Sequence, residues 1–149
     1  MFDETLIPIE SYEVDPHPSY TLFKLHTKKG TVPLYTSREV NEQLRRDYRR
    51  PVTHDIISGV VAGFDLKIIK CVIDHVEESI YFANLFLDRS GKEIVSIDVR
   101  PSDVLILLKT HTFPLYISQK VLDLTRDDVM RYWTPVFSSK LFVHLGRGI

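Results

Sequence analysis

The stretch Ile97-Asp98-Val99-Arg100-Pro101-Ser102-Asp103 decides the fold, because it ends one element and begins the next. Residues 93–99 alternate in the manner of a strand, so the side chains of Asp98 and Arg100 are expected to share a face. The apolar run at 104–108 fits a buried strand or a buried helix, and the Pro-Ser-Asp segment before it favours the helix. The stretch therefore predicts a strand that passes into a helix through a charged corner.

A second arginine-proline corner lies upstream, at Arg50-Pro51-Val52-Thr53-His54-Asp55. Thr53 is a good N-cap, and a wide apolar helical face is predicted by the spacing of Ile56, Ile57, Val60, Val61 and Phe64. The positive charge of an arginine is unfavourable at the positive end of a helix dipole. Its presence at both corners indicates a nearby anion, either a protein carboxylate or a bound phosphate.

Length and composition fit one domain. The chain has 149 residues, of which 44% are hydrophobic and 26% charged, and no apolar run approaches the ~20 residues of a membrane span. The acidic start and the single cysteine, Cys71, predict neither export nor a disulfide framework, so we expect a cytoplasmic protein. We expect a domain over residues 1–133 and a tail over 134–149 that adds an edge strand or contacts a partner.

Charge is distributed unevenly along the chain. The net charge of −1 excludes a uniformly basic nucleic-acid-binding surface, yet residues 21–50 contain eight basic and three acidic side chains. Within them, the run from Arg45 to Arg50, which includes Arg49, places Tyr48 among guanidinium groups, as on nucleic-acid-binding surfaces. A solvated helix face explains this run equally well.

Alternation and turn residues predict the remaining strands. Residues 5–14 are expected to be extended, 15–18 to form a loop, and 20–26 to pair with 31–35 as a hairpin. The runs 66–75 and 80–88 are apolar on both faces, which indicates central strands.

Helices are predicted between these strands. Thr36 and Glu39 fit a capping box that begins a helix with Val40, Leu44 and Tyr48 on one stripe. The segment 113–121 repeats the pattern of 32–40, a short strand that passes into a helix at a serine, and 125–133 is expected to be a further helix. The sum is an α+β fold: a single compact domain with a mixed or antiparallel sheet and packed helices.

The two corners contain the candidate functional residues. Arg50 and Arg100 have the guanidinium donors of a phosphate clamp, or they pair structurally, Arg100 with Asp98 or Asp103 and Arg50 with Asp55. His54 beside Asp55 suits a base with its orienting group, a metal-binding edge, or ordinary capping chemistry.

The carboxylates Asp98 and Asp103 are candidate ligands for a divalent metal such as Mg²⁺ or Mn²⁺. An ion held there activates water and neutralises charge during phosphodiester hydrolysis. Two carboxylates at this spacing are also common by chance.

Four features carry a family resemblance: Val32-Pro33-Leu34-Tyr35, the two corners, the long strands, and Phe113-Pro114-Leu115-Tyr116-Ile117-Ser118. Together they resemble the bifunctional nuclease domain family over about residues 5–125. The resemblance implies a compact α+β domain that is often dimeric and acts on DNA and RNA. The residues that match the family pattern are Arg50, Thr53, His54, Asp55, Asp98, Arg100, Ser102 and Asp103.

These observations lead to two hypotheses. In the first, the protein is a homodimeric nuclease that hydrolyses phosphodiester bonds, with His54, Asp55, Asp98 and Asp103 as catalytic residues. The side chains expected to bind phosphate are those of Arg45, Arg49, Arg50, Thr53, Arg100 and Ser102. In the second, the protein is a dimeric, non-catalytic binding or regulatory module in which the same cluster is structural.

Overall fold

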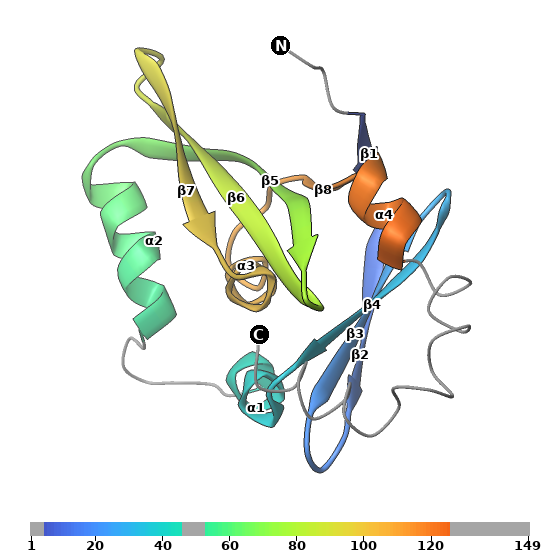
Figure 1. Cartoon of the computed structure of the whole chain (residues 1–149). Coiled ribbons are helices and arrows are strands. Elements are labelled where there is room, and N and C mark those ends of the chain that lie inside the picture. Colours follow the sequence, from blue (N-terminus) through green and yellow to red (C-terminus); the bar gives the residue numbers. More distant parts are fainter. Residues whose placement is uncertain (1–4, 46–52, 126–149) are drawn as a thin grey trace.

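The computed structural model describes residues 5–45 and 53–125, whose strands form two sheets (Figure 1). The first sheet has five strands in the order β1-β8-β5-β6-β7, and the second has three in the order β2-β3-β4. The strands are β1 (Leu6–Pro8), β2 (Ser11–Pro16), β3 (Thr21–Thr27), β4 (Gly30–Thr36), β5 (Leu66–Glu77), β6 (Ile80–Arg89), β7 (Glu93–Val99) and β8 (Leu115–Ser118). The helices are α1 (Arg38–Arg45), α2 (Thr53–Gly63), α3 (Pro101–Leu107) and α4 (Gln119–Thr125). The predicted α+β class is confirmed.

The hairpin of β5 and β6 forms the centre of the five-stranded sheet. β5 pairs antiparallel with β6 and parallel with β8, so the sheet is mixed and both long strands are central, as their apolar faces predict. Their connection is a tight turn in which Glu78 and Ser79 have φ angles of 49° and 65°. Two consecutive left-handed residues match the twist of a hairpin, although neither is glycine.

The N-terminal segment 5–14 divides between the two sheets. β1 pairs with β8, whereas β2 pairs with β3. The predicted hairpin of 20–26 with 31–35 is confirmed as β3 and β4. The predicted loop at 15–18 is wrong in its first half, because Asp15 and Pro16 still pair with β3. A proline is tolerated there because β2 is an outer strand of the described sheet.

The helix predicted after β4 is present as α1, but Thr36 does not cap it. Thr36 is the last residue of β4, and its buried hydroxyl donates to the carbonyl of Thr21 at 3.0 Å. The capping box at this position is therefore wrong, because Thr36 pairs within the sheet and α1 begins only at Arg38.

The strand-to-helix passage at a serine is confirmed at β8 and α4. The backbone N–H of Val121 donates to Oγ of Ser118 at 3.2 Å, which caps the first turn. Most of the helix predicted at 125–133, the end of the expected 1–133 domain and the whole 134–149 tail lie outside the described residues.

One core joins both sheets with α3 and α4. Its fully buried side chains include Phe23, Leu25, Leu34, Ile73, Leu85, Leu105, Ile117 and Leu122. The run at 104–108 is helical over most of its length, since α3 ends at Leu107, and residues 104–107 are buried. Cys71 is also in this core, where burial and the nearby Asp74 charge raise the pKa of its thiol to about 12.

The helix predicted from Thr53 is confirmed as α2, but only part of its wide apolar face is buried. Ile57 and Val61 pack against the core, but Ile56 and Phe64 are 63% and 73% exposed. Val60, which lies between them on the same stripe, is 44% exposed. No described element covers this side of the helix.

The left-handed turn between β5 and β6 gives a first prediction. Ser79→Gly should raise the free energy of unfolding by about 0.5–1 kcal/mol, because glycine adopts a positive φ without the steric cost borne by serine. Chemical denaturation measures the change. Ser96→Gly, in the extended strand β7, is the matched control and should give no gain; an equal gain from both variants would refute the turn explanation.

Candidate functional site

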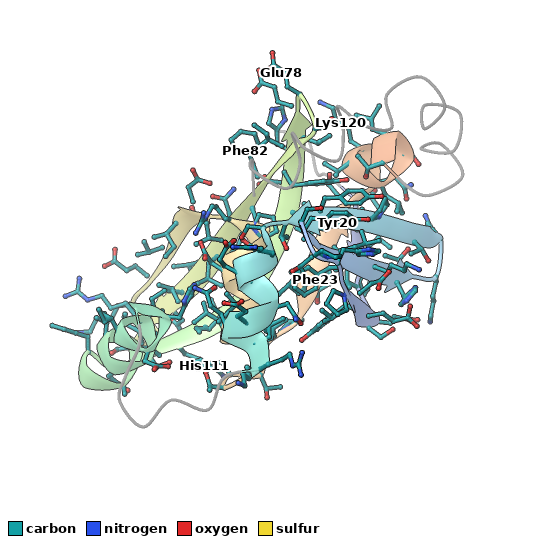
Figure 2. The ribbon with its side chains drawn as sticks, turned by 90° about the horizontal axis from the view of Figure 1, so that it is seen from below. Tyr20, Phe23, Glu78, Phe82, His111 and Lys120 are labelled. Carbon is teal, nitrogen blue, oxygen red and sulfur yellow. The ribbon has the colours of Figure 1, made fainter. Side chains whose placement is uncertain are left out.

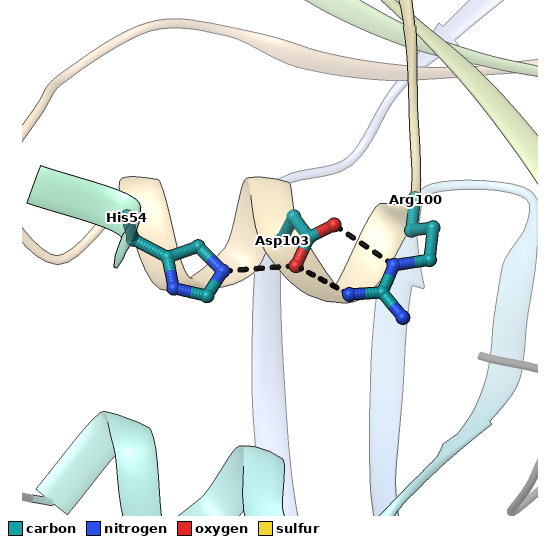
Figure 3. Close-up of polar contacts among 3 residues, drawn as sticks. All are labelled: His54, Arg100 and Asp103. Carbon is teal, nitrogen blue, oxygen red and sulfur yellow. Dashed lines mark hydrogen bonds and ion pairs between the residues drawn. The ribbon is translucent and has the colours of Figure 1, made fainter. Parts of the chain in front are cut away.

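The first turns of α2 and α3 meet through one pair of side chains. Nε2 of His54 lies 2.9 Å from Oδ1 of Asp103, across 49 positions of sequence (Figure 3). Both side chains are largely buried, with exposed fractions of 15% and 24%. The helix that follows the first corner therefore reaches the second corner.

Arg100 binds the same carboxylate from the other side. Its Nε donates to Oδ2 of Asp103 at 2.9 Å, and its Nη2 donates to Oδ1 at 3.1 Å (Figure 3). Because Pro101 follows, Arg100 has an extended backbone, with φ −80° and ψ 138°, at the N-cap of α3. Of the two partners that the sequence left open for Arg100, the structure selects Asp103.

These contacts set the charge state of the cluster. Burial of the Asp103 carboxyl acts to raise its pKa, but the hydrogen bonds from Arg100 and His54 outweigh burial, and the pKa lies below its usual range. The hydrogen bonding of Arg100 to Asp103 and the Asp103 charge raise the pKa of Arg100. Asp103 is therefore an ionised acceptor between two nitrogen groups at neutral pH.

A second polar contact joins α2 to the chain just after α3. Oγ of Ser58 lies 2.6 Å from Nε2 of His111. Ser58 is four residues after His54, so both lie on one face of α2. Two histidine contacts thus hold α2 in place, although few of its apolar side chains are buried.

A pocket of about 420 Å³ lies beside this cluster. Four predicted site residues line it: His54, Asp98, Arg100 and Asp103. Its apolar wall consists of Ile57, Ile80, Tyr81, Phe82, Val99, Val104 and Leu107. The volume is within the range of small-ligand sites, roughly 300–1,000 Å³. Asp98 reaches the pocket from β7, where it pairs with Asn84 of β6.

The other predicted site residues whose side chains are described do not line the pocket. Ser102 is 1% exposed, so it does not offer its hydroxyl to a phosphate in solvent. Asp55 and the exposed Arg45 are not among the lining residues. Thr53 begins α2 and its side chain is outside the described part, as are Arg49 and Arg50 entirely.

The two predicted metal ligands, Asp98 and Asp103, both line the pocket. Both oxygens of Asp103 are taken by Arg100 and His54, and His54 has Asp103 as its partner rather than the neighbouring Asp55. Across residues 5–45 and 53–125, no group of three or more His, Cys, Asp or Glu side chains is placed to hold a metal ion. The role of Asp98 and Asp103 as metal ligands therefore stays a prediction.

Sequence reasoning missed the aromatic wall of the pocket and the Ser58–His111 contact. Tyr81 and Phe82 follow directly after the β5–β6 turn, and pairing of β6 with β7 brings them to the second corner. The spacing of His54 and Ser58, one helical turn, was the available signal for a second contact on that face.

A family model covers the part of the chain that forms this pocket. The family model of the bifunctional nuclease domain matches residues 31–129, well over half of the chain. The chain belongs to the bifunctional nuclease domain family. The match includes all of the pocket-lining residues. In the described ranges, no helix is both long and apolar enough to cross a membrane.

Two relatives of the chain come from Mycobacterium tuberculosis. They are the uncharacterized proteins MT1877 of strain CDC 1551 / Oshkosh and Rv1829 of strain ATCC 25618 / H37Rv. Each is 32% identical over 75 residues, which cover 49% of this chain and 42% of the relative. The matched segment thus spans less than half the length of these relatives.

The charge of Asp103 gives a prediction about pH. Asp103→Asn should lower the free energy of unfolding at pH 7 by about 1–2 kcal/mol, because the charged hydrogen bonds to Arg100 and His54 are weakened. Since the native pKa is depressed, this contribution is present above the ordinary Asp pKa of about 4 and is lost as pH falls through the native pKa.

Urea unfolding of the wild type and of Asp103→Asn between pH 7 and pH 2 measures their difference in the free energy of unfolding. This difference should become smaller at the acid end. Glu42→Gln, on the exposed side of α1, should have the same free energy of unfolding as the wild type. A difference that stays constant down to pH 2 would contradict the ion-pair explanation.

Proposed function

We propose that the protein is a nuclease that hydrolyses phosphodiester bonds of DNA or RNA at the pocket between α2, α3 and β7. The observation that supports this most directly is the convergence of His54, Asp98, Arg100 and Asp103 on one open pocket. Membership of the bifunctional nuclease domain family supports the same class of activity. Hydrolysis needs a group that binds phosphate and a group that moves a proton, and the pocket contains both types.

Arg100 is the proposed phosphate-binding group. Asp103 engages two of its nitrogens, and the side chain is 64% exposed. A guanidinium group has five N–H donors, so donors remain for a phosphate oxygen. Phe82, half-buried on the same wall, offers aromatic surface to a base, which favours single-stranded substrates. The basic run with Arg45, Arg49 and Arg50 belongs to the proposal as an extension of the phosphate-binding surface.

His54 is the proposed general base, and Asp103 positions it. An ionised carboxylate only accepts hydrogen bonds, so the Nε2 atom that faces Asp103 carries a hydrogen. In a neutral imidazole the other nitrogen, Nδ1, then has the free lone pair. That atom can take a proton from water as the water attacks phosphorus. One P–O ester bond of the substrate then breaks, and the leaving oxygen takes a proton from solvent.

Three further features belong to the proposal. We propose that cleavage requires Mg²⁺ or Mn²⁺, that the protein is a homodimer, and that it acts in the cytoplasm. His54 and Arg100 are the proposed proton acceptor and phosphate-binding group, and neither is a proposed metal ligand. Apolar side chains exposed on β7 support the dimer.

A non-catalytic binding or regulatory module is the alternative, and one observation favours it. Asp103 is fully engaged by Arg100 and His54, as expected for a cluster that only fixes α2 against α3. In that case the wild type does not cleave nucleic acid, and substitutions of His54, Arg100 or Asp103 change only the stability of the fold.

Cleavage assays distinguish the two functions. His54→Gln should reduce cleavage of single-stranded RNA or DNA by about 100-fold or more, because it removes the proton acceptor. Arg100→Ala should weaken substrate binding and raise KM. Each protein is assayed with Mg²⁺, with Mn²⁺ and with a chelator, and its melting temperature is recorded.

Lys24→Ala, on β3 in the three-stranded sheet, is the matched surface control and should keep wild-type activity. Equal cleavage by wild type and His54→Gln would indicate a contaminating nuclease and refute the catalytic role. Loss of stability in the variants, with no cleavage by a folded wild type under any metal condition, would identify the module instead.

A further inference from the structure

β7 is exposed along nearly its whole length. It is the outer strand of the described five-stranded sheet, and Ile94, Val95 and Ile97 are 67%, 42% and 38% exposed. Because side chains alternate, Ile94 lies on one face of the sheet, and Val95 and Ile97 lie on the other. An apolar outer strand that leaves its backbone N–H and C=O groups unpaired is a template for pairing with another strand.

The charges on β7 show which strand would fit. Glu93 pairs with Arg89 at 2.9 Å and Arg100 pairs with Asp103, but Lys92 and Asp98 have no ion-pair partner in the described part of the chain. Lys92 directly precedes β7, and Asp98 is near its other end. Opposite charges at opposite ends make the strand complementary to an antiparallel copy of itself.

Two-fold symmetry limits the possible registers. A two-fold axis perpendicular to the sheet places one residue of β7 opposite itself. With Val95 at the axis, Lys92 of each copy is opposite Asp98 of the other, so the favourable pair forms twice. With Ser96 at the axis, Lys92 is opposite Arg100, and like charges repel. With Ile97 at the axis, Asp98 is opposite Ser96, and Lys92 has no residue of the other β7 opposite it.

We propose that β7 pairs with β7 of a second copy about Val95, so that the two five-stranded sheets become continuous. The exposed stripe of Ile56, Val60 and Phe64 on α2 supports a second copy, because α2 lies on the same side of the molecule as β7 (Figures 1 and 2). A partner that extends the sheet there would also approach this stripe.

The pairing has a consequence for the pocket. Asp98 lines the pocket, so Lys92 of the second copy would stand at the pocket rim and add a cation beside Arg100. This part rests on the proposed nuclease function and gives the lysine the role of a second phosphate contact. The interface itself does not depend on activity and is tested without it.

Charge reversal in the full-length protein tests the register. Lys92→Glu and Asp98→Lys should each weaken dimerisation by about 10-fold or more, because each creates two like-charge contacts. An equimolar mixture of the two variants should recover the dimer, since every cross-copy contact then joins opposite charges. Light scattering after size-exclusion chromatography measures the masses, and Lys120→Glu on the exposed side of α4 is the control.

Hydrogen exchange at the β7 amides identifies the occupant. Protection that increases with protein concentration supports the second copy. A monomeric wild type with β7 amides protected at all concentrations would mean that the chain covers β7 itself and would overturn the proposal. Failure of the mixed variants to dimerise would overturn the register, whatever the result of the cleavage assays.

Discussion

The carboxylate of Asp103 is the group on which the arrangement of the two corners depends. It binds Arg100 at the start of its own helix and His54 at the start of α2. These contacts join segments that are far apart in sequence and place both beside the end of β7. Without an acceptor at this position, α2 would lose one of the two histidine contacts that join it to α3 and the chain after it.

Much of the fold could be predicted from local pattern. The β3–β4 and β5–β6 hairpins follow from alternation and turn residues, and Pro101 distinguished a helix from a strand in an apolar run. Where the prediction failed, a distant partner decided the outcome. The hydroxyl of Thr36 donates to Thr21 of β3, so Thr36 belongs to the sheet and does not cap α1. Ile56 faces solvent because no described element covers α2 there.

The candidate site was predictable in its residue types and not in its pairings. The sequence pointed to His54, Asp98, Arg100 and Asp103, and these line one pocket. It could not show that His54 pairs with Asp103 rather than Asp55, because that choice depends on how two helices approach each other. Ser102 has the right chemistry for phosphate, but helix rotation turns it into the core.

The position of Cys71 has a consequence for oxidative chemistry. Its thiol is buried in the central sheet and has a pKa of about 12, so it is neither ionised nor accessible to disulfide partners or peroxides at neutral pH. Cys71 therefore does not react with oxidants while the sheet around it is intact. A thiol reagent would label this single sulfur only when β5 separates from its neighbours, which makes Cys71 an intrinsic reporter of global opening.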